Sequence, residues 1–75
     1  MEETEIVRDI VEKLRSERLG QGISQAELSR RTGLSRSGIR HMENGDVTPT
    51  LLFLLRIARD LGVSLADLLR EDGKA

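Results

Sequence analysis

The sequence predicts a compact all-α bundle of five helices, and three observations lead to this fold class. The chain has 75 residues, enough for one domain, which we expect to span residues 1–75. Leu, Arg and Glu are its commonest residues, and all three favour helices. Phe53 is the only aromatic residue and cysteine is absent, so an aromatic-rich β-sandwich and a disulfide-bonded scaffold are both disfavoured.

The first two helices are expected at about residues 4–19 and 24–32. An apolar stripe at helical spacing marks the first: Ile6, Val7, Ile10, Val11 and Leu14. The glycines of Gly20-Gln21-Gly22 should end it. Ser24, followed three residues later by Glu27, has the spacing of a capping box that opens the second helix.

The third helix is expected at about residues 35–44, after a turn at Gly33. A glycine suits this turn because it tolerates a left-handed backbone. Ser35 is the predicted N-cap, and Ile39 and Met42 share the inner face of the helix. Asn44-Gly45 is a strong stop signal.

The last two helices are expected at about residues 49–61 and 64–71, with a frayed tail at 72–75. Thr48 is the predicted cap of the fourth helix, because Pro49 would then occupy its first position. Residues placed on the inner arc of the fourth helix are Leu51, Leu54, Leu55, Ile57, Ala58 and Leu61. In the fifth helix the inward residues are expected to be Leu65, Leu68 and Leu69.

Composition also narrows the classes of function. A single histidine and the lack of cysteine leave no catalytic set and no metal cluster, so we expect no enzyme, no metal, no cofactor and no small-molecule ligand. The longest apolar run, residues 51–55, is far too short to span a membrane, and the acidic start MEETE is unlike a leader peptide. We therefore expect a cytoplasmic protein without membrane contact.

The charge is nearly balanced overall but unevenly distributed along the chain. A net charge of −1 argues against a protein that coats nucleic acid by charge alone. Residues 15–46 nevertheless carry six Arg against four acidic side chains, whereas residues 1–14 carry five acids against two bases. This distribution fits a compact domain with one basic face.

The stretch from Gln25 to Asn44, QAELSRRTGLSRSGIRHMEN, meets the steric demands of a helix-turn-helix unit. Such a unit needs an inward apolar residue and then a small residue in its first helix, a turn with an apolar plug, and two inward apolar residues in its second helix. The residues that fill these positions are Leu28, Ser29, Gly33, Leu34, Ile39 and Met42. The competing interpretation is a generic helical hairpin in an unrelated bundle.

This segment resembles the phage Cro/repressor type of helix-turn-helix domain, the XRE family. The likeness continues through GISQAEL, GLSRSGIRHMENGDVTPTL and IARDLGVSLADLL, and covers about residues 14–70. The resemblance implies a five-helix lambda-repressor-like fold and a transcriptional regulator that binds near-palindromic operators in double-stranded DNA as a homodimer. Such a protein would be associated with the nucleoid through DNA.

In this docking mode the second helix of the motif enters the major groove, with its N-terminal residues on base edges. The resemblance assigns base contacts to Arg36, Ser37, Arg40 and His41. The competing interpretation is that these side chains form only a solvated polar face.

Contacts to DNA phosphates are implied for Gln25, Ser35, Asn44 and Thr48. Unpaired N–H groups and the dipole favour an anion at a helix N-terminus, which supports Gln25 and Ser35 on physical grounds. The alternative for these two residues is a capping role alone. Thr48 is the weakest candidate because its predicted task is capping the fourth helix.

Two further family positions are Arg18 and Glu43, which the resemblance implies to be a structural ion pair without DNA contact. Gly38 departs from the family pattern, which usually has Ser or Thr there. The acidic N-terminus is also atypical, and we expect it to point away from the duplex.

Leu52 and Phe53 fall off the predicted core arc of the fourth helix, which indicates a partner surface. Family dimers join through this region, so the implied dimer interface consists of Leu52, Phe53, Val63, Leu65 and Ala66. A second hypothesis is an antitoxin-like or adaptor protein that uses this patch for another protein. An inert helical scaffold is a third.

Overall fold

The computed structural model describes residues 2–70, and within them every regular element is a helix. The five helices have these bounds: α1 Glu3–Gly20, α2 Gln25–Thr32, α3 Arg36–Asn44, α4 Leu51–Leu61 and α5 Leu65–Leu69. The prediction of an all-α bundle is confirmed. The end of the fifth helix and the tail predicted at 71–75 lie outside the described residues.

Hydroxyl side chains begin four of these helices. Ser24, Ser35 and Ser64 each accept a hydrogen bond from the backbone N–H three residues ahead, which confirms the predicted caps Ser24 and Ser35. The prediction for α4 is wrong by two residues, because Thr50, not Thr48, is its N-cap and accepts from the N–H of Phe53 at 3.1 Å. Pro49 therefore precedes the helix.

A glycine at positive φ follows each of the two helices of the helix-turn-helix unit. Gly33 follows α2 with φ +77°, and Gly45 follows α3 with φ +82°. The N–H groups of Gly45 and Asp46 bond back to carbonyls of the last turn of α3. These bonds satisfy carbonyls that a helix end otherwise leaves unpaired.

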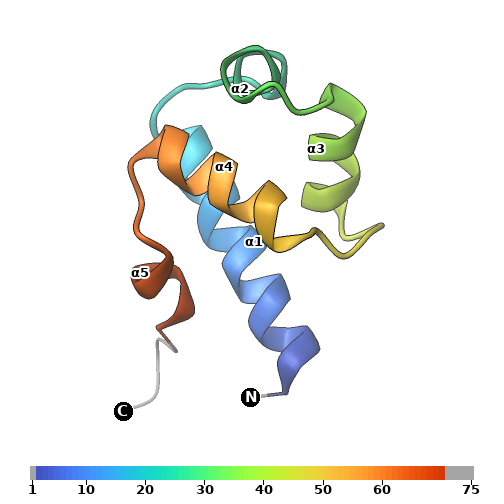
Figure 1. Cartoon of the computed structure of the whole chain (residues 1–75), viewed down its shortest axis with the longest axis vertical. Coiled ribbons are helices and arrows are strands. Elements are labelled where there is room, and N and C mark those ends of the chain that lie inside the picture. The colour runs from blue at the N-terminus through green and yellow to red at the C-terminus, as the bar shows by residue number, and fades with distance from the viewer. Residues whose placement is uncertain (1, 71–75) are drawn as a thin grey trace.

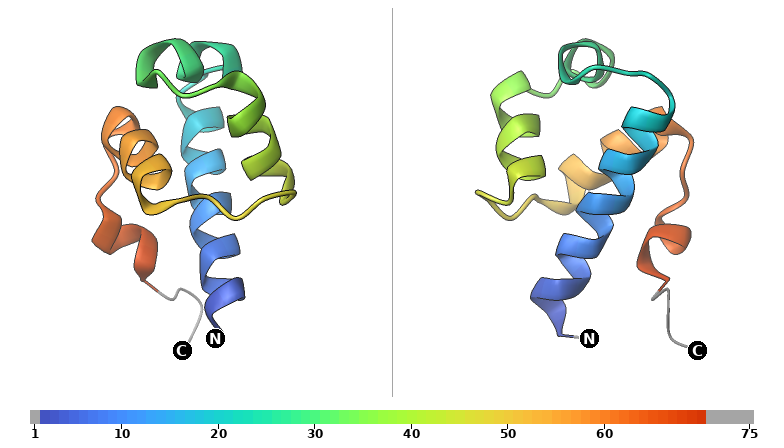
Figure 2. Two further views of the ribbon diagram at one scale, coloured as in Figure 1. Left: turned by 45° about the vertical axis from the view of Figure 1, so that its right-hand side comes forward. Right: turned by 180° about the vertical axis from the view of Figure 1, so that it is seen from behind.

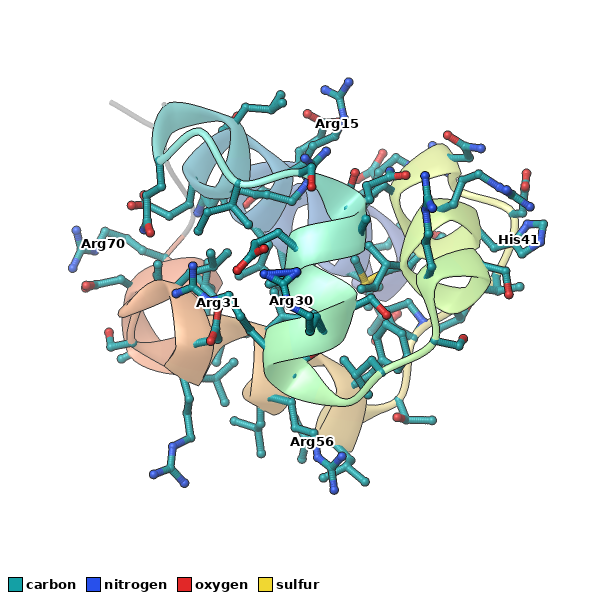
Figure 3. All side chains as sticks on the ribbon, turned by 90° about the horizontal axis from the view of Figure 1, so that it is seen from above. Arg15, Arg30, Arg31, His41, Arg56 and Arg70 are labelled. Carbon is teal, nitrogen blue, oxygen red and sulfur yellow. The ribbon has the colours of Figure 1, made fainter. Side chains whose placement is uncertain are left out.

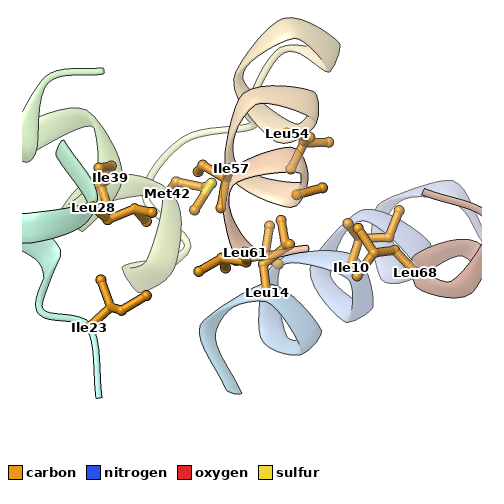
Figure 4. Close-up of a cluster of buried hydrophobic side chains, with 12 residues drawn as sticks. Ile10, Leu14, Ile23, Leu28, Ile39, Met42, Leu54, Ile57, Leu61 and Leu68 are labelled. Atoms are coloured by element: carbon orange, nitrogen blue, oxygen red, sulfur yellow. The ribbon is translucent and has the colours of Figure 1, made fainter. Parts of the chain in front are cut away.

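The helices surround one continuous hydrophobic core (Figure 4). Figure 4 shows Leu28 beside Ile39 at the end formed by α2 and α3, and Ile10 beside Leu68 at the end formed by α1 and α5. Leu28 and Ile39 are fully buried. The inward positions predicted for the helix-turn-helix unit thus join the same core as the rest of the domain.

Two leucines assigned to the core lie elsewhere. Leu51 is 61% exposed, because the later start of α4 places it at the first helical position, at the edge of the bundle. Leu69 is 49% exposed in the last turn of the short α5. The core side of α4 is formed instead by Leu54, Ile57, Ala58 and Leu61.

The arrangement places α3 at the edge of the molecule (Figure 1). α1 runs along the long direction, α4 crosses it, and α5 lies beside its N-terminal half (Figures 1 and 2). α2 and α3 cover the other end of α1, and α3 stands at the outside in each of these views. No helix within residues 2–70 is both long and apolar enough to cross a membrane.

Candidate nucleic-acid interface

The turn between α2 and α3 is fixed by side-chain hydrogen bonds as well as by Gly33. The Ser29 hydroxyl donates to the carbonyl of Leu34 at 2.6 Å, and the Thr32 hydroxyl donates to the carbonyl of Leu28 at 2.7 Å. Thr32 Oγ1 also accepts from the N–H of Leu34 at 3.2 Å. These bonds set the angle at which α3 leaves the turn, because they tie both sides of Gly33 to α2.

The outer face of α3 carries polar side chains directed away from the core. Arg36, Ser37 and Arg40 are exposed, and His41 is half-buried. Figure 3 shows His41 at the periphery of the molecule, on the far side of α3 from α1. His41 Nδ1 lies 3.1 Å from Asp46 Oδ2, so the residue after the helix stop orients the imidazole. The four predicted base-contact residues are therefore brought together on one helix surface.

The predicted phosphate-contact residues flank this surface. Ser35 caps α3 by accepting from Gly38 N–H at 3.0 Å, which leaves its hydroxyl hydrogen able to donate. Asn44 ends α3, and Thr48 is exposed in the loop that leads to α4. Since Thr50 caps α4, the capping role expected for Thr48 does not exist.

Gln25 begins α2 but its side chain turns toward α3. Its amide nitrogen donates to Glu43 Oε1 at 2.9 Å, a bond that was not predicted from the sequence. A primary amide has two N–H donors, so one remains for a phosphate oxygen. Gln25 thus links the start of α2 to the end of α3.

Glu43 also accepts a bidentate pair of hydrogen bonds from Arg18. Arg18 Nε lies 2.8 Å from Oε2 and Nη2 lies 2.8 Å from Oε1, and both side chains are buried. Arg18 Nη1 donates in addition to the carbonyl of Ile23 at 2.8 Å. One guanidinium therefore joins α1, the loop before α2, and α3.

Burial tends to raise the pKa of the Glu43 carboxyl, but its neighbours outweigh that effect. Hydrogen bonds from Arg18 and Gln25, and the charges of Arg18 and Arg15, bring this pKa below its ordinary value of 4.5. Arg15 Nε lies 3.9 Å from Oε1. Glu43 is consequently ionised at neutral pH, as the bidentate pair requires.

Two further arginines of the motif, Arg30 and Arg31, form ion pairs. Arg31 Nε lies 3.1 Å from Asp60 Oδ2 and connects α2 to α4, whereas Arg30 pairs with Glu27 within α2. Both arginines lie on α2, apart from the polar face of α3 (Figure 3).

The residues predicted for a dimer interface differ in exposure. Leu52 is 60% exposed at the first turn of α4, and Ala66 is exposed in α5. Phe53, Val63 and Leu65 are partly buried against the core. Leu52 and the segment 63–66 adjoin opposite ends of α4, so any shared interface has to run along that helix.

Comparison with known proteins gives consistent results. The profile of the helix-turn-helix family matches residues 14–68. Over 56 residues, 75% of this chain, the sequence is 41% identical to the uncharacterised HTH-type transcriptional regulator y4dL of Sinorhizobium fredii. Over 49 residues, 65% of this chain, it is 41% identical to an uncharacterised HTH-type transcriptional regulator of Methanothermobacter thermautotrophicus.

The aligned segments cover 29% of the first relative and 71% of the second, so the chain spans less than a third of y4dL. No solved structure matches the chain. The family match begins inside α1, includes the whole α2–turn–α3 unit and ends inside α5. The family predicted from the sequence is thus confirmed, and the chain belongs to the XRE-type helix-turn-helix family.

Proposed function

We propose that this chain is a sequence-specific DNA-binding transcriptional regulator whose helix α3 enters the major groove. The observation that carries the proposal is that α3 is held on its inner side while its outer side remains open. Ile39 and Met42 are buried, and Glu43 is tied to Arg18, whereas Arg36, Ser37 and Arg40 are exposed. A helix held in this way can present its side chains to base edges without a change in its own position.

We assign the residues of this surface two roles, contact with base edges and contact with DNA phosphates. Arg36, at the start of α3, has the fork of N–H donors that fits guanine O6 and N7, and Ser37, Arg40 and His41 follow on the same surface. Each good base contact contributes about 1–3 kcal/mol of discrimination. Gln25, Ser35, Asn44 and Thr48 flank this surface as phosphate contacts, which fix the register on the duplex.

The proposed functional unit is a homodimer. The exposed apolar side chains at the start of α4, Leu51 and Leu52, support a partner surface there, continued along α4 toward Val63, Leu65 and Ala66. Two-fold symmetry would place the two copies of α3 about 34 Å apart, one turn of B-form DNA. The operator would then be close to palindromic.

Selection of bound duplexes from a random pool tests this proposal. We expect enrichment of a two-fold-symmetric consensus whose half-sites lie about 10 base pairs apart. Affinity for the enriched site should fall steeply with salt, because phosphate contacts release counterions. A pool that remains random after repeated rounds would contradict the proposal.

The adaptor hypothesis retains one supporting observation, the same exposed Leu51 and Leu52. A hetero-partner would use this patch, whereas a regulator would cover it with a second copy. Sedimentation of the pure chain separates the two: a dimer that Leu52→Glu dissociates supports the regulator, and a monomer at all concentrations supports the adaptor. As the matched control, Leu19→Glu changes a leucine of similar exposure, 52%, on α1.

A further inference from the structure

Gly38, in the first turn of α3, faces a side chain from another helix. A Cβ atom placed on Gly38 would lie 3.2 Å from Cζ and 3.4 Å from Cε1 of Phe53, and 2.7 Å from the Oγ of Ser35. Carbon atoms in favourable contact lie about 3.5–4.0 Å apart. A β-carbon at position 38 would therefore lie closer to the edge of the Phe53 ring than a favourable contact allows.

The two residues occupy equivalent places in their helices. Gly38 is the third residue of α3 and its N–H is bonded by the cap Ser35, while Phe53 is the third residue of α4 and its N–H is bonded by the cap Thr50. Both backbones are thus fixed at the point where they meet.

This contact adds to the core that α3 and α4 already share, to which Met42 and Ile57 both belong. The backbone of α3 lies closest to α2 and α1, and α4 lies closest to α1 and α2. Phe53 is only partly buried and packs against the hydrophobic core, so its ring spans from α4 to the first turn of α3. Position 38 lies four residues before the buried Met42, on the inner side of the helix.

We infer that Phe53 is a positioning residue for DNA recognition, because its ring sets the height and tilt of the first turn of α3, which carries Arg36 and Ser37. Because Gly38 has no β-carbon, the ring can lie against this turn of α3. This inference rests on the proposed function, and it assigns Phe53 to the support of the reading helix instead of the dimer interface. It also accounts for glycine at a helical position where it lowers helix propensity.

The test is a double-mutant cycle with Gly38→Ala and Phe53→Leu, measured on the consensus duplex selected by the wild-type chain. Leucine ends at Cδ and lacks the Cε1 and Cζ atoms that a β-carbon at position 38 would meet. The readout is the ratio of Kd for a scrambled duplex to Kd for the consensus, alongside the urea midpoint of each variant. Leu19→Ala, at a leucine of α1 that is 52% exposed and lies outside the proposed DNA and dimer surfaces, is the control.

We expect Gly38→Ala to remain folded and to lose about tenfold or more of this ratio, the size of one good base contact. Phe53→Leu in the Gly38→Ala background should restore part of the loss, although it removes apolar contact. The Ser35 contact is not relieved by Phe53→Leu, so rescue is partial. Leu19→Ala should leave the ratio unchanged.

Two results would overturn the inference. One is a Gly38→Ala variant that discriminates as well as wild type, and the other is a double variant whose loss is the simple sum of the two single losses. A wild-type chain that selects no consensus would instead refute the proposed function. Unfolding midpoints then still report whether Phe53 and Gly38 are coupled in the folded state.

Discussion

Arg18 and Glu43 join the last turn of α1 to the last turn of α3 through two hydrogen bonds of 2.8 Å between buried side chains. Gln25 adds the start of α2 to the same carboxylate. A single anion therefore connects the three helices that carry or support the proposed DNA-binding surface. The orientation of α3 depends on this carboxylate as well as on the apolar core.

Glu43→Gln tests the energetic importance of the pair. The substitution keeps the shape but leaves the buried guanidinium of Arg18 without its counterion, and we expect a loss of about 3–5 kcal/mol in the free energy of unfolding. Urea unfolding of both chains measures the difference. The exposed pair Arg30–Glu27 serves as control, and Arg30→Gln should cost less than about 1 kcal/mol. Equal costs for the two variants would refute a special role for Glu43.

The lowered pKa of Glu43 predicts a pH dependence with a definite sign. Because the folded-state pKa lies below the ordinary value of 4.5, the stabilisation is fully present above pH 4.5 and is lost as pH falls through the folded-state pKa. The stability difference between wild type and Glu43→Gln should be constant from pH 5 to 7. Below pH 4.5 it should shrink, by at most about 1.4 kcal/mol per pH unit. A difference that grows on acidification would contradict the assignment.

Gly33→Ala tests the turn before α3. At φ +77° an alanine is strained although nothing lies within 4 Å of its β-carbon, and we expect a loss of about 1–2 kcal/mol. Gly20→Ala is the matched control, because Gly20 ends α1 without positive φ and also has open space around it. There alanine should be neutral or stabilise by up to about 1 kcal/mol. The thermal unfolding midpoints of both variants measure these effects, and a Gly33→Ala variant as stable as Gly20→Ala would contradict the prediction.

Thr50→Ala and Thr48→Ala separate capping from DNA contact. Removal of the Thr50 cap should lower the unfolding free energy by about 1 kcal/mol. Thr48 is exposed and precedes the helix, so Thr48→Ala should leave stability unchanged and weaken binding to all duplexes alike. A destabilised Thr48→Ala chain with full DNA affinity would reverse both assignments.

Local signals predicted most of the secondary structure because they act within a few residues. Serine caps, helix-stopping glycines and apolar spacing located α2 and α3 within about one residue. The start of α4 was misplaced because Thr48 and Thr50 both flank Pro49, and only the backbone path distinguishes them. Leu51 shares the helical face of Leu54 and Ala58, but it is exposed because it is the first residue of α4.

Contacts between distant segments were harder to predict. Arg18 and Glu43, 25 residues apart, were expected to pair only through family resemblance. No sequence pattern indicated that Gln25 bonds to Glu43, or that Lys13 donates to the carbonyls of Leu68 and Arg70 at the end of α5. The contact between Phe53 and Gly38 was likewise not predicted, and the only related sequence feature was the unusual glycine at position 38.

If the first turn of α3 contacts base edges, as we propose, Arg36→Ala should change the base preferences of the chain at a defined position. The wild-type chain and the variant would be selected against the same random duplex pool, and the two sets of preferences compared position by position. We predict that the variant loses its preference at one base pair in each half-site and keeps the others. An unchanged consensus, or an equal weakening at every position, would contradict it.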